Sequence, residues 1–279
     1  TQRQLLALGC ARVVPALPLL WQQAEALLPH YAFDLPARLL AEAAEIRRAF
    51  GLLADAESRR QFVGQLRWQL RGEIDALPEP TPAEQYFPPD LIALHPGERL
   101  LDGGAYDGDT IRALLARGQG WAHITALEPD PANREALAAY LQTLDAGLRA
   151  RIEVRAAAIG ARAGRVRFAA SGGTGAAVSA DGGVEVECVA LDELCAAAPP
   201  TFIKLDIEGA EHDALEGARR LIARNRPVIA VSAYHQPGDL WRIPLHLHAL
   251  EGSYRLHLRT HAADGWEVVA YAIPPERRV

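Results

Sequence analysis

Residues 100–110 read Leu-Leu-Asp-Gly-Gly-Ala-Tyr-Asp-Gly-Asp-Thr, an apolar strand that enters a glycine-rich turn and then an amphipathic helix. Glycines let the backbone approach a ligand closely, and the first turn of a helix offers free N–H groups. The spacing is not G-x-G-x-x-G, and Asp102, Asp107 and Asp109 would repel a pyrophosphate. Carboxylates suit a ligand with a positive centre and free hydroxyls, such as S-adenosylmethionine. The alternative is an ordinary strand-to-helix turn in which aspartates cap the helix.

From about Asp90 onward, short β-type runs alternate with helical segments that begin near Thr110, Pro131, Glu211 and Asp239. This alternation predicts an α/β fold, a parallel sheet with helices on both faces. The turn residues 262–265 join the last two strands as an antiparallel hairpin. The predicted strands are Arg99–Asp102, His123–Glu128, Ile152–Arg155, Phe202–Asp206, Val228–Tyr234, Tyr254–Thr260 and Glu267–Ala272.

The regular alternation fails between Gly160 and Thr201. Residues 171–175 and 181–183 are rich in glycine, and β-type runs flank them at Val166–Phe168 and Val184–Val189. We expect a hairpin with a mobile tip.

Three parts are predicted along the chain. Residues 1–77 have apolar positions at helical spacing, for example Leu39, Ile46 and Phe50, and form a helical N-terminal region. Residues 78–89 are a proline-rich linker, because proline ends helices. Residues 90–279 form the sheet domain.

The second strand ends at Glu128, Pro129 and Asp130, immediately before a helix. An acidic residue at this position can accept hydrogen bonds from both ribose hydroxyls of a nucleoside cofactor. Alternatively, Glu128 and Asp130 merely favour the N-terminus of the helix electrostatically. Residues 156–160 are small and apolar, so Ala158 is a candidate for contact with an adenine ring.

Residues 202–211, Phe-Ile-Lys-Leu-Asp-Ile-Glu-Gly-Ala-Glu, form a buried-type strand with three carboxylates around one glycine at its tip. This segment resembles the FkbM-type family of S-adenosylmethionine-dependent methyltransferases. The resemblance includes the aspartate- and glycine-rich turn before the segment and Ser-Ala-Tyr-His at 232–235 after it. It covers roughly residues 82–274 in order.

The resemblance implies a class I methyltransferase, Rossmann-like sheet with strand order 3-2-1-4-5-7-6, an antiparallel last strand and the cofactor over the carboxyl ends of the first strands. Family members mostly methylate hydroxyl groups of sugars, glycolipids or secondary metabolites. The family's site residues transfer to the turn, with Asp102 at its start, and to the end of the second strand. Gly103, Gly104, Asp107, Gly108 and Thr110 would line the methionine part, Glu128 would bind the ribose, and Asp130 would lie on the ribose or adenine side.

Methyl transfer to an alcohol needs a base near the methyl group. Asp206 and His235 end neighbouring strands, so we expect His235 to take the hydroxyl proton while Asp206 orients the ring. Alternatively, His235 satisfies a turn and Asp206 contacts the ammonium group of the cofactor. Glu208 and Glu211 are candidates for binding the acceptor hydroxyl, for ligating Mg²⁺ with Asp206, or for favouring the helix start. Metal dependence therefore stays open.

Aromatic and basic residues near His235 are candidates for the acceptor pocket, namely Tyr234, Trp241 and Arg242. Arg259 belongs to a strand with Arg255, His257 and His261 on one face. This basic face is either solvated or receives a negatively charged acceptor.

The chain has 279 residues and a net charge of −6, and its basic residues are scattered. This pattern disfavours nucleic acid as the main partner and leaves a small hydroxylated acceptor. No apolar run reaches the roughly 20 residues that span a bilayer. Three cysteines without a C-x-x-C pair indicate buried, reduced thiols and a cytoplasmic protein.

Two other functions compete with the methyltransferase. A nicotinamide-dependent oxidoreductase is disfavoured by the glycine spacing and the terminal hairpin. A catalytically silent cofactor-binding module of a biosynthetic assembly is disfavoured by the intact acidic and histidine positions. An oligomer or larger assembly through residues 1–77 stays open.

Overall fold

The computed structural model describes residues 2–118, 120–173, 175–179 and 181–277. Its main sheet has the strands β1 (Arg99–Gly103), β2 (His123–Leu127), β3 (Ile152–Arg155), β8 (Phe202–Leu205), β9 (Val228–Ser232), β10 (Arg255–Thr260) and β11 (Val268–Ile273). The spatial order is β10-β11-β9-β8-β1-β2-β3. Counted along the chain within this sheet, the order is 3-2-1-4-5-7-6, as predicted.

The strand directions also agree with the prediction. Neighbours among β1, β2, β3, β8 and β9 pair in parallel, whereas β11 runs antiparallel to both β9 and β10. The carboxyl ends of the five parallel strands therefore meet along one edge of the sheet.

Helices cover both faces of this sheet, and each face has its own hydrophobic core. One face carries α7 (Asp109–Ala116), α8 (Pro131–Gln142) and α9 (Ala146–Arg149). The other carries α10 (Leu191–Leu194), α11 (Glu211–Gly217), α12 (Arg219–Asn225) and α13 (Asp239–Leu250).

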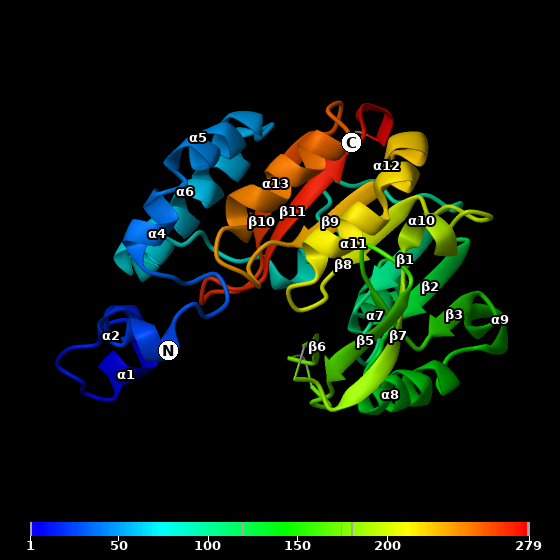
Figure 1. Cartoon of the computed structure of the whole chain (residues 1–279), viewed down its shortest axis with the longest axis horizontal. Coiled ribbons are helices and arrows are strands. Elements are labelled where there is room, and N and C mark those ends of the chain that lie inside the picture. The colour runs from blue at the N-terminus through cyan, green and yellow to red at the C-terminus, as the bar shows by residue number, and fades with distance from the viewer. Residues whose placement is uncertain (1, 119, 174, 180, 278–279) are drawn as a thin grey trace.

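A second, four-stranded sheet lies beside the carboxyl ends of β1 and β2 (Figure 1). Its strands are β4 (Ala157–Ile159), β5 (Gly164–Ala169), β6 (Ala177–Val178) and β7 (Val184–Val189), in the order β4-β7-β5-β6. The antiparallel pairing of β5 with β7 confirms the predicted hairpin. Thr174, part of its predicted tip, lies outside the described residues. The short strands β4 and β6 were not predicted.

The chain before the proline-rich stretch is helical, as predicted. It forms α1 (Gln2–Ala7), α2 (Leu17–Gln22), α3 (Ala24–Leu27), α4 (Pro36–Leu40), α5 (Ala43–Leu52) and α6 (Ala56–Arg71). Single 3-10 turns are η1 (Ile74–Ala76), η2 (Pro82–Glu84) and η3 (Pro275–Arg277). Figure 1 shows α5 and α6 beside α13, with α1 and α2 farther from the sheet. The helix α5 packs on α13 and α6 packs on β10, so these helices share the core of the main sheet.

Within the described part of the chain, no helix combines the length and the apolar character that a membrane crossing requires. Cys188 and Cys195 are buried, as predicted, but Cys10 is exposed, so the prediction of three buried thiols is wrong for that residue. Cys10 follows the short helix α1, whose described side chains from residue 4 to residue 7 are exposed as well.

Candidate active site

A cavity opens at the carboxyl edge of the main sheet, between this edge and the second sheet. Of the predicted site residues, Gly104, Glu128, Pro129, Ala158, Asp206, Glu208 and Tyr234 line it. Its other described lining residues include Gln85, Tyr86, Tyr106, Asp109, Asn133, Phe168 and Glu267. The cavity thus joins residues that are far apart in the sequence.

Backbone crowding explains the glycine turn after β1. Gly104 has φ +74°, and a Cβ atom there would collide with the carbonyl oxygen of Asp206. Only glycine fits such an approach without displacing the backbone. Gly103 lies against the side-chain ends of Ile159 and Leu205 and does not line the cavity in the described structure.

A buried ion pair stabilises the turn after β1. The Lys204 ammonium lies 3.1 Å from Asp102 Oδ1 and donates hydrogen bonds to the carbonyl oxygens of Gly103 and Gly104. Burial raises the pKa of Asp102 to about 6, although Lys204 opposes this shift. Asp102 was a predicted cofactor ligand, but the structure directs it to Lys204 and not into the cavity.

Three further residues that were predicted to bind the cofactor lie at the N-terminus of α7. Asp107 forms an ion pair with Arg112, and Gly108, with φ +91°, faces the side chain of Tyr140. Thr110 is buried. None of these three lines the cavity, whereas Asp109, the first residue of α7, does.

Glu128 lies at the end of β2 and faces the cavity, as predicted. Its Oε2 accepts a hydrogen bond of 2.8 Å from the Tyr106 N–H, and its Oε1 accepts one of 2.8 Å from the Asp130 N–H. These bonds fix the carboxylate and leave each oxygen with a further lone pair. Burial raises the pKa of Glu128, and the two backbone hydrogen bonds act against that shift.

The carboxylate of Asp130, predicted to lie on the ribose or adenine side of the cofactor, binds backbone N–H groups instead. Its Oδ1 accepts hydrogen bonds from Ala132 N and Asn133 N, and its Oδ2 accepts bonds of 3.0 Å from Ser171 N and Gly172 N. These four bonds tie the start of α8 to the glycine-rich loop of the second sheet. They use the acceptor positions that a ribose or adenine ligand would need.

The opposite wall of the cavity is apolar. Ala157, Ala158 and Ile159 of β4 and Phe168 of β5 line it and are buried. The position predicted for Ala158 beside a flat apolar ring is therefore compatible with the structure.

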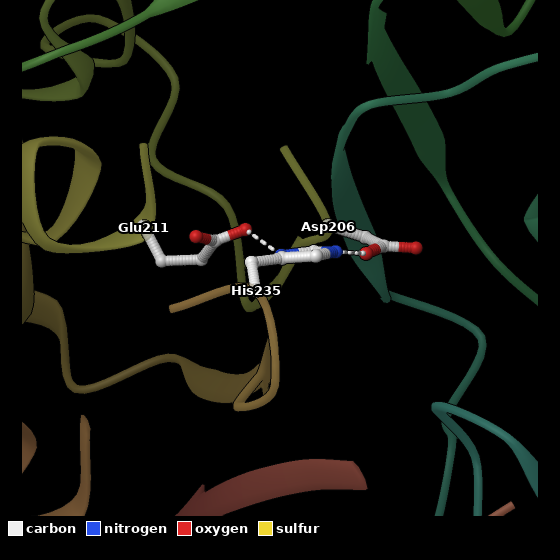
Figure 2. A group of neighbouring side chains, drawn as sticks. All are labelled: Asp206, Glu211 and His235. Atoms are coloured by element: carbon white, nitrogen blue, oxygen red, sulfur yellow. Dashed lines mark hydrogen bonds and ion pairs between the residues drawn. The ribbon is translucent and has the colours of Figure 1, made fainter. Parts of the chain in front are cut away.

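His235 lies between two carboxylates, as Figure 2 shows. Its Nδ1 is 2.7 Å from Glu211 Oε1, and its Nε2 is 3.4 Å from Asp206 Oδ1. Glu211 Oε1 also accepts a hydrogen bond from the Ile207 N–H, which fixes the carboxylate. The partner that orients the imidazole is therefore Glu211, and not Asp206 as predicted.

His235 does not itself line the cavity, but the two carboxylates beside its Nε2 do. Glu208 Oε1 lies 3.7 Å from Nε2, and both Asp206 and Glu208 line the cavity. Neither His235 Nε2 nor Asp206 Oδ1 has a hydrogen-bond partner among the described residues. Asp206 Oδ2 accepts a hydrogen bond of 2.7 Å from the Tyr86 hydroxyl.

Charge sets the protonation of this cluster. Burial alone lowers the pKa of His235, but Glu211 and then Asp206 and Glu208 outweigh it and raise the pKa to about 10. Burial raises the pKa of Glu208 to about 7, against the effect of His235. Burial also acts to raise the pKa of Asp206, but Lys204 and His235 hold it below its ordinary value. The surrounding carboxylates therefore favour the protonated imidazole in the cofactor-free protein.

Asp206, Glu211 and His235 are close enough to be considered as metal ligands. In the observed arrangement, however, the two carboxylates lie on opposite sides of the imidazole ring (Figure 2). One ion cannot bind both ring nitrogens, so these three side chains would have to rearrange to hold a metal together.

Three predicted acceptor residues lie outside the cavity and bind the N-terminal region instead. The buried Trp241 donates a hydrogen bond of 2.9 Å to Glu42, which also forms an ion pair with Arg242. Arg259, whose side chain is 7% exposed, pairs with Asp55 at 3.0 Å and with Asp90 at 2.6 Å. The expected basic surface on β10 is therefore largely buried under α6, and of the four acceptor candidates only Tyr234 lines the cavity.

Several residues of the site were not expected from the sequence. Tyr86 and Gln85 enter from the end of the linker, and Glu267 enters from the start of β11. Glu267 accepts hydrogen bonds from Gln85 Nε2 and from the Tyr234 hydroxyl. Tyr86 and Glu267 have positive φ values of 63° and 53°, which are unusual for residues other than glycine. No spacing in the sequence brings these segments together.

Comparisons with known proteins agree with this architecture. The FkbM methyltransferase domain matches residues 102–257. The chain is similar to the crystal structure of the methyltransferase FkbM from Methylobacillus flagellatus, with 27% identity and a TM-score of 0.75 over 85% of this chain. The match covers 60% of that protein, so this chain spans less than two thirds of its length.

An O-methyltransferase from Bacillus cereus in complex with SAH is also similar, with 18% identity and a TM-score of 0.41 over 92% of this chain and 97% of that one. The comparison with curated proteins gives no match. The family match covers more than half of the sequence, and it includes the turn after β1 and the Glu211, His235 and Asp206 cluster. The chain belongs to the FkbM methyltransferase family.

Proposed function

We propose that the chain is an S-adenosylmethionine-dependent O-methyltransferase that acts on a hydroxyl of a sugar, a glycolipid or a secondary metabolite. The observation that carries this proposal is the position of His235. Its Nε2 has no hydrogen-bond partner among the described residues and lies next to Asp206 and Glu208, which line the cavity, and its Nδ1 is held by the buried Glu211.

The cavity suits the proposed cofactor along its length. The apolar wall of β4 and Phe168 fits an adenine ring, and Glu128 at the end of β2 has lone pairs for ribose hydroxyls. Asp109, Asp206 and Glu208 provide negative charge where a sulfonium and an ammonium group need it. When bound, S-adenosylmethionine supplies the methyl group, and the electron pair of the broken S–C bond stays with sulfur.

The residues of the chain would then position the acceptor and take its proton. The acceptor oxygen uses a lone pair to form the new C–O bond, and its proton passes to His235 Nε2. Glu211 keeps the ring oriented during this transfer and stabilises the imidazolium that results. His235 must first lose the proton that it carries in the cofactor-free protein. A cation in the cavity favours this loss, because it repels the imidazolium and interacts with the same carboxylates.

The experiment that tests the proposal combines binding with turnover. Calorimetry with S-adenosylmethionine measures the cofactor site, and release of S-adenosylhomocysteine with a panel of hydroxylated acceptors measures the reaction. We expect His235→Ala to keep cofactor affinity within about threefold and to lose turnover by about a hundredfold or more. Comparable turnover in this variant would exclude His235 as the base, and absence of cofactor binding in the unmodified chain would exclude the proposed function.

A further inference from the structure

A short segment of the N-terminal region, residues 28–34, reaches the catalytic cluster. The Tyr31 ring lies 6.2 Å from the His235 ring and 5.2 Å from the Trp266 ring, measured between centroids. A Cβ atom on Gly175, in the loop of the second sheet, would lie 3.9 Å from the Tyr31 hydroxyl. Tyr31 therefore lies beside His235, with Trp266 of the β10–β11 turn and Gly175 of the second sheet's loop as further neighbours.

The segment is anchored on both sides of Tyr31. His30 and Phe33 exchange backbone hydrogen bonds, and the buried Phe33 packs against Trp68 and Trp266. The Trp21 indole donates a hydrogen bond to the Asp34 carbonyl oxygen. Tyr31 itself stays 37% exposed, and its backbone has a φ of 48°. A large aromatic side chain is thus fixed in position but left accessible.

Trp266 adjoins Tyr31, and neither residue lines the cavity itself, whereas Tyr234, which Trp266 contacts, does. Trp266 lies in the turn between β10 and β11, is half-buried, and contacts Tyr234 with a centroid separation of 6.0 Å. Tyr234 in turn lies 4.3 Å from the His235 ring. Aromatic rings thus extend from the anchored segment to the proposed base.

The charges beside these rings are mainly negative. Asp206, Glu208 and Glu267 line the cavity, whereas Arg259, the basic residue expected to bind a charged acceptor, is paired and buried elsewhere. A phosphorylated acceptor would meet repulsion at this place. An uncharged ring can rest its apolar face on an aromatic side chain and direct hydroxyl groups to the carboxylates.

Resting on the proposed function, we propose that Tyr31 and Trp266 form an acceptor subsite that takes the apolar face of an uncharged hydroxylated ring and turns one of its hydroxyls toward His235. Tyr31 is then a positioning residue that the N-terminal region contributes to the active site. This role also gives the N-terminal region a part in the choice of acceptor.

The experiment uses the full chain and two matched sets of probes, the methyl glycosides of common hexoses and the corresponding hexose 6-phosphates. Turnover is followed as release of S-adenosylhomocysteine, and calorimetry measures glycoside binding to the S-adenosylhomocysteine complex. The variants are Tyr31→Ala, Tyr31→Phe and Trp266→Phe. Leu19→Ala, an exposed change in α2 of the same region, is the control. Affinity for S-adenosylmethionine is measured for every variant.

We expect neutral glycosides to bind and react, and the 6-phosphates to do so at least about tenfold less well. Tyr31→Ala should raise the KM for the best glycoside about tenfold and weaken its binding to the same extent, while cofactor affinity changes less than about twofold. Tyr31→Phe and Trp266→Phe keep an aromatic face and should change the KM less than about threefold, and Leu19→Ala should change nothing.

Three results would overturn the proposal. They are an unchanged glycoside KM in Tyr31→Ala, a preference for the phosphorylated probes, and no reaction with any glycoside despite normal cofactor binding. If the unmodified chain failed to bind S-adenosylmethionine, the proposed function would fail instead, so the two failures are distinguishable.

Discussion

His235 Nδ1 lies 2.7 Å from Glu211 Oε1, and the side chains of both residues are 1% exposed. Glu211 begins α11 and His235 follows β9, so the pair joins two elements at the carboxyl edge of the sheet. A carboxylate in this position fixes the ring and favours its charged form. The same contact therefore controls the orientation of the proposed base and its pKa.

The variant Glu211→Gln tests this control. The amide side chain would keep the shape of the carboxylate but remove its charge, so the pKa of His235 should fall toward its ordinary value and turnover should fall about tenfold or more. NMR titration of the His235 ring gives the pKa directly. Glu216→Gln, a change on the exposed side of the same helix, is the control and should leave the His235 titration unchanged. A titration in Glu211→Gln like that of the unmodified chain would refute the assignment.

The pH dependence of stability gives a second test. The folded-state pKa of His235, about 10, lies above the ordinary value of about 6.5 for an unfolded chain. Its contribution to the free energy of unfolding is thus fully present below about pH 6.5, declines as the pH rises, and is lost once the pH passes about 10. Denaturant unfolding of the cofactor-free chain should show this decline. His235→Gln should flatten it, and identical slopes for the two proteins would count against the raised pKa.

Two acidic residues near the glycine turn should differ in their effect on cofactor binding. Glu128 faces the cavity, so Glu128→Ala should weaken binding of S-adenosylmethionine by about 10- to 100-fold. Asp107 pairs with Arg112, so Asp107→Ala should stay within about threefold. Calorimetry with S-adenosylmethionine and S-adenosylhomocysteine measures both. Equal losses in the two variants would show that the cofactor does not bind as proposed.

Arg259 should matter for stability and not for the acceptor. Arg259→Ala removes the partner of Asp90 and one of the partners of Asp55, which keeps its contact with His257, and loosens α6 from β10, so the free energy of unfolding should fall by about 3 kcal/mol. Chemical denaturation measures the loss, and hydrogen exchange should rise first in α6. Arg255→Ala in the same strand is the control. An acceptor KM that rose without a loss of stability would restore Arg259 as an acceptor ligand.

The central sheet could be predicted from the sequence because its strands are local, apolar and separated by strong turn residues. Each end of the seven predicted strands lies within two residues of the corresponding strand end in the structure. The proposed catalytic cluster was predictable in part, since neighbouring parallel strands bring Asp206 and His235 together. The role of Glu211 was harder to predict, because it depends on how the first turn of α11 faces the ring.

The remaining site residues depend on contacts between distant segments. Tyr31 and Tyr86 reach the site from the N-terminal region and the linker, and no periodicity marks them. Arg259 belongs to a strand whose alternating pattern is typical of an exposed basic face. In the structure, α6 covers that face, and Asp55 at the N-terminus of α6 pairs with Arg259. Packing of the N-terminal helices on the sheet thus decided which polar residues stayed accessible.

The role of His235 as the base is tested most sharply by its pKa, measured by NMR in the free chain, with S-adenosylhomocysteine, and with S-adenosylmethionine. We expect a pKa of about 10 in the free chain and a lower one with S-adenosylmethionine than with S-adenosylhomocysteine, because only the former carries the sulfonium charge. A pKa near 6.5 in the free chain, or one that neither cofactor changes, would contradict this role.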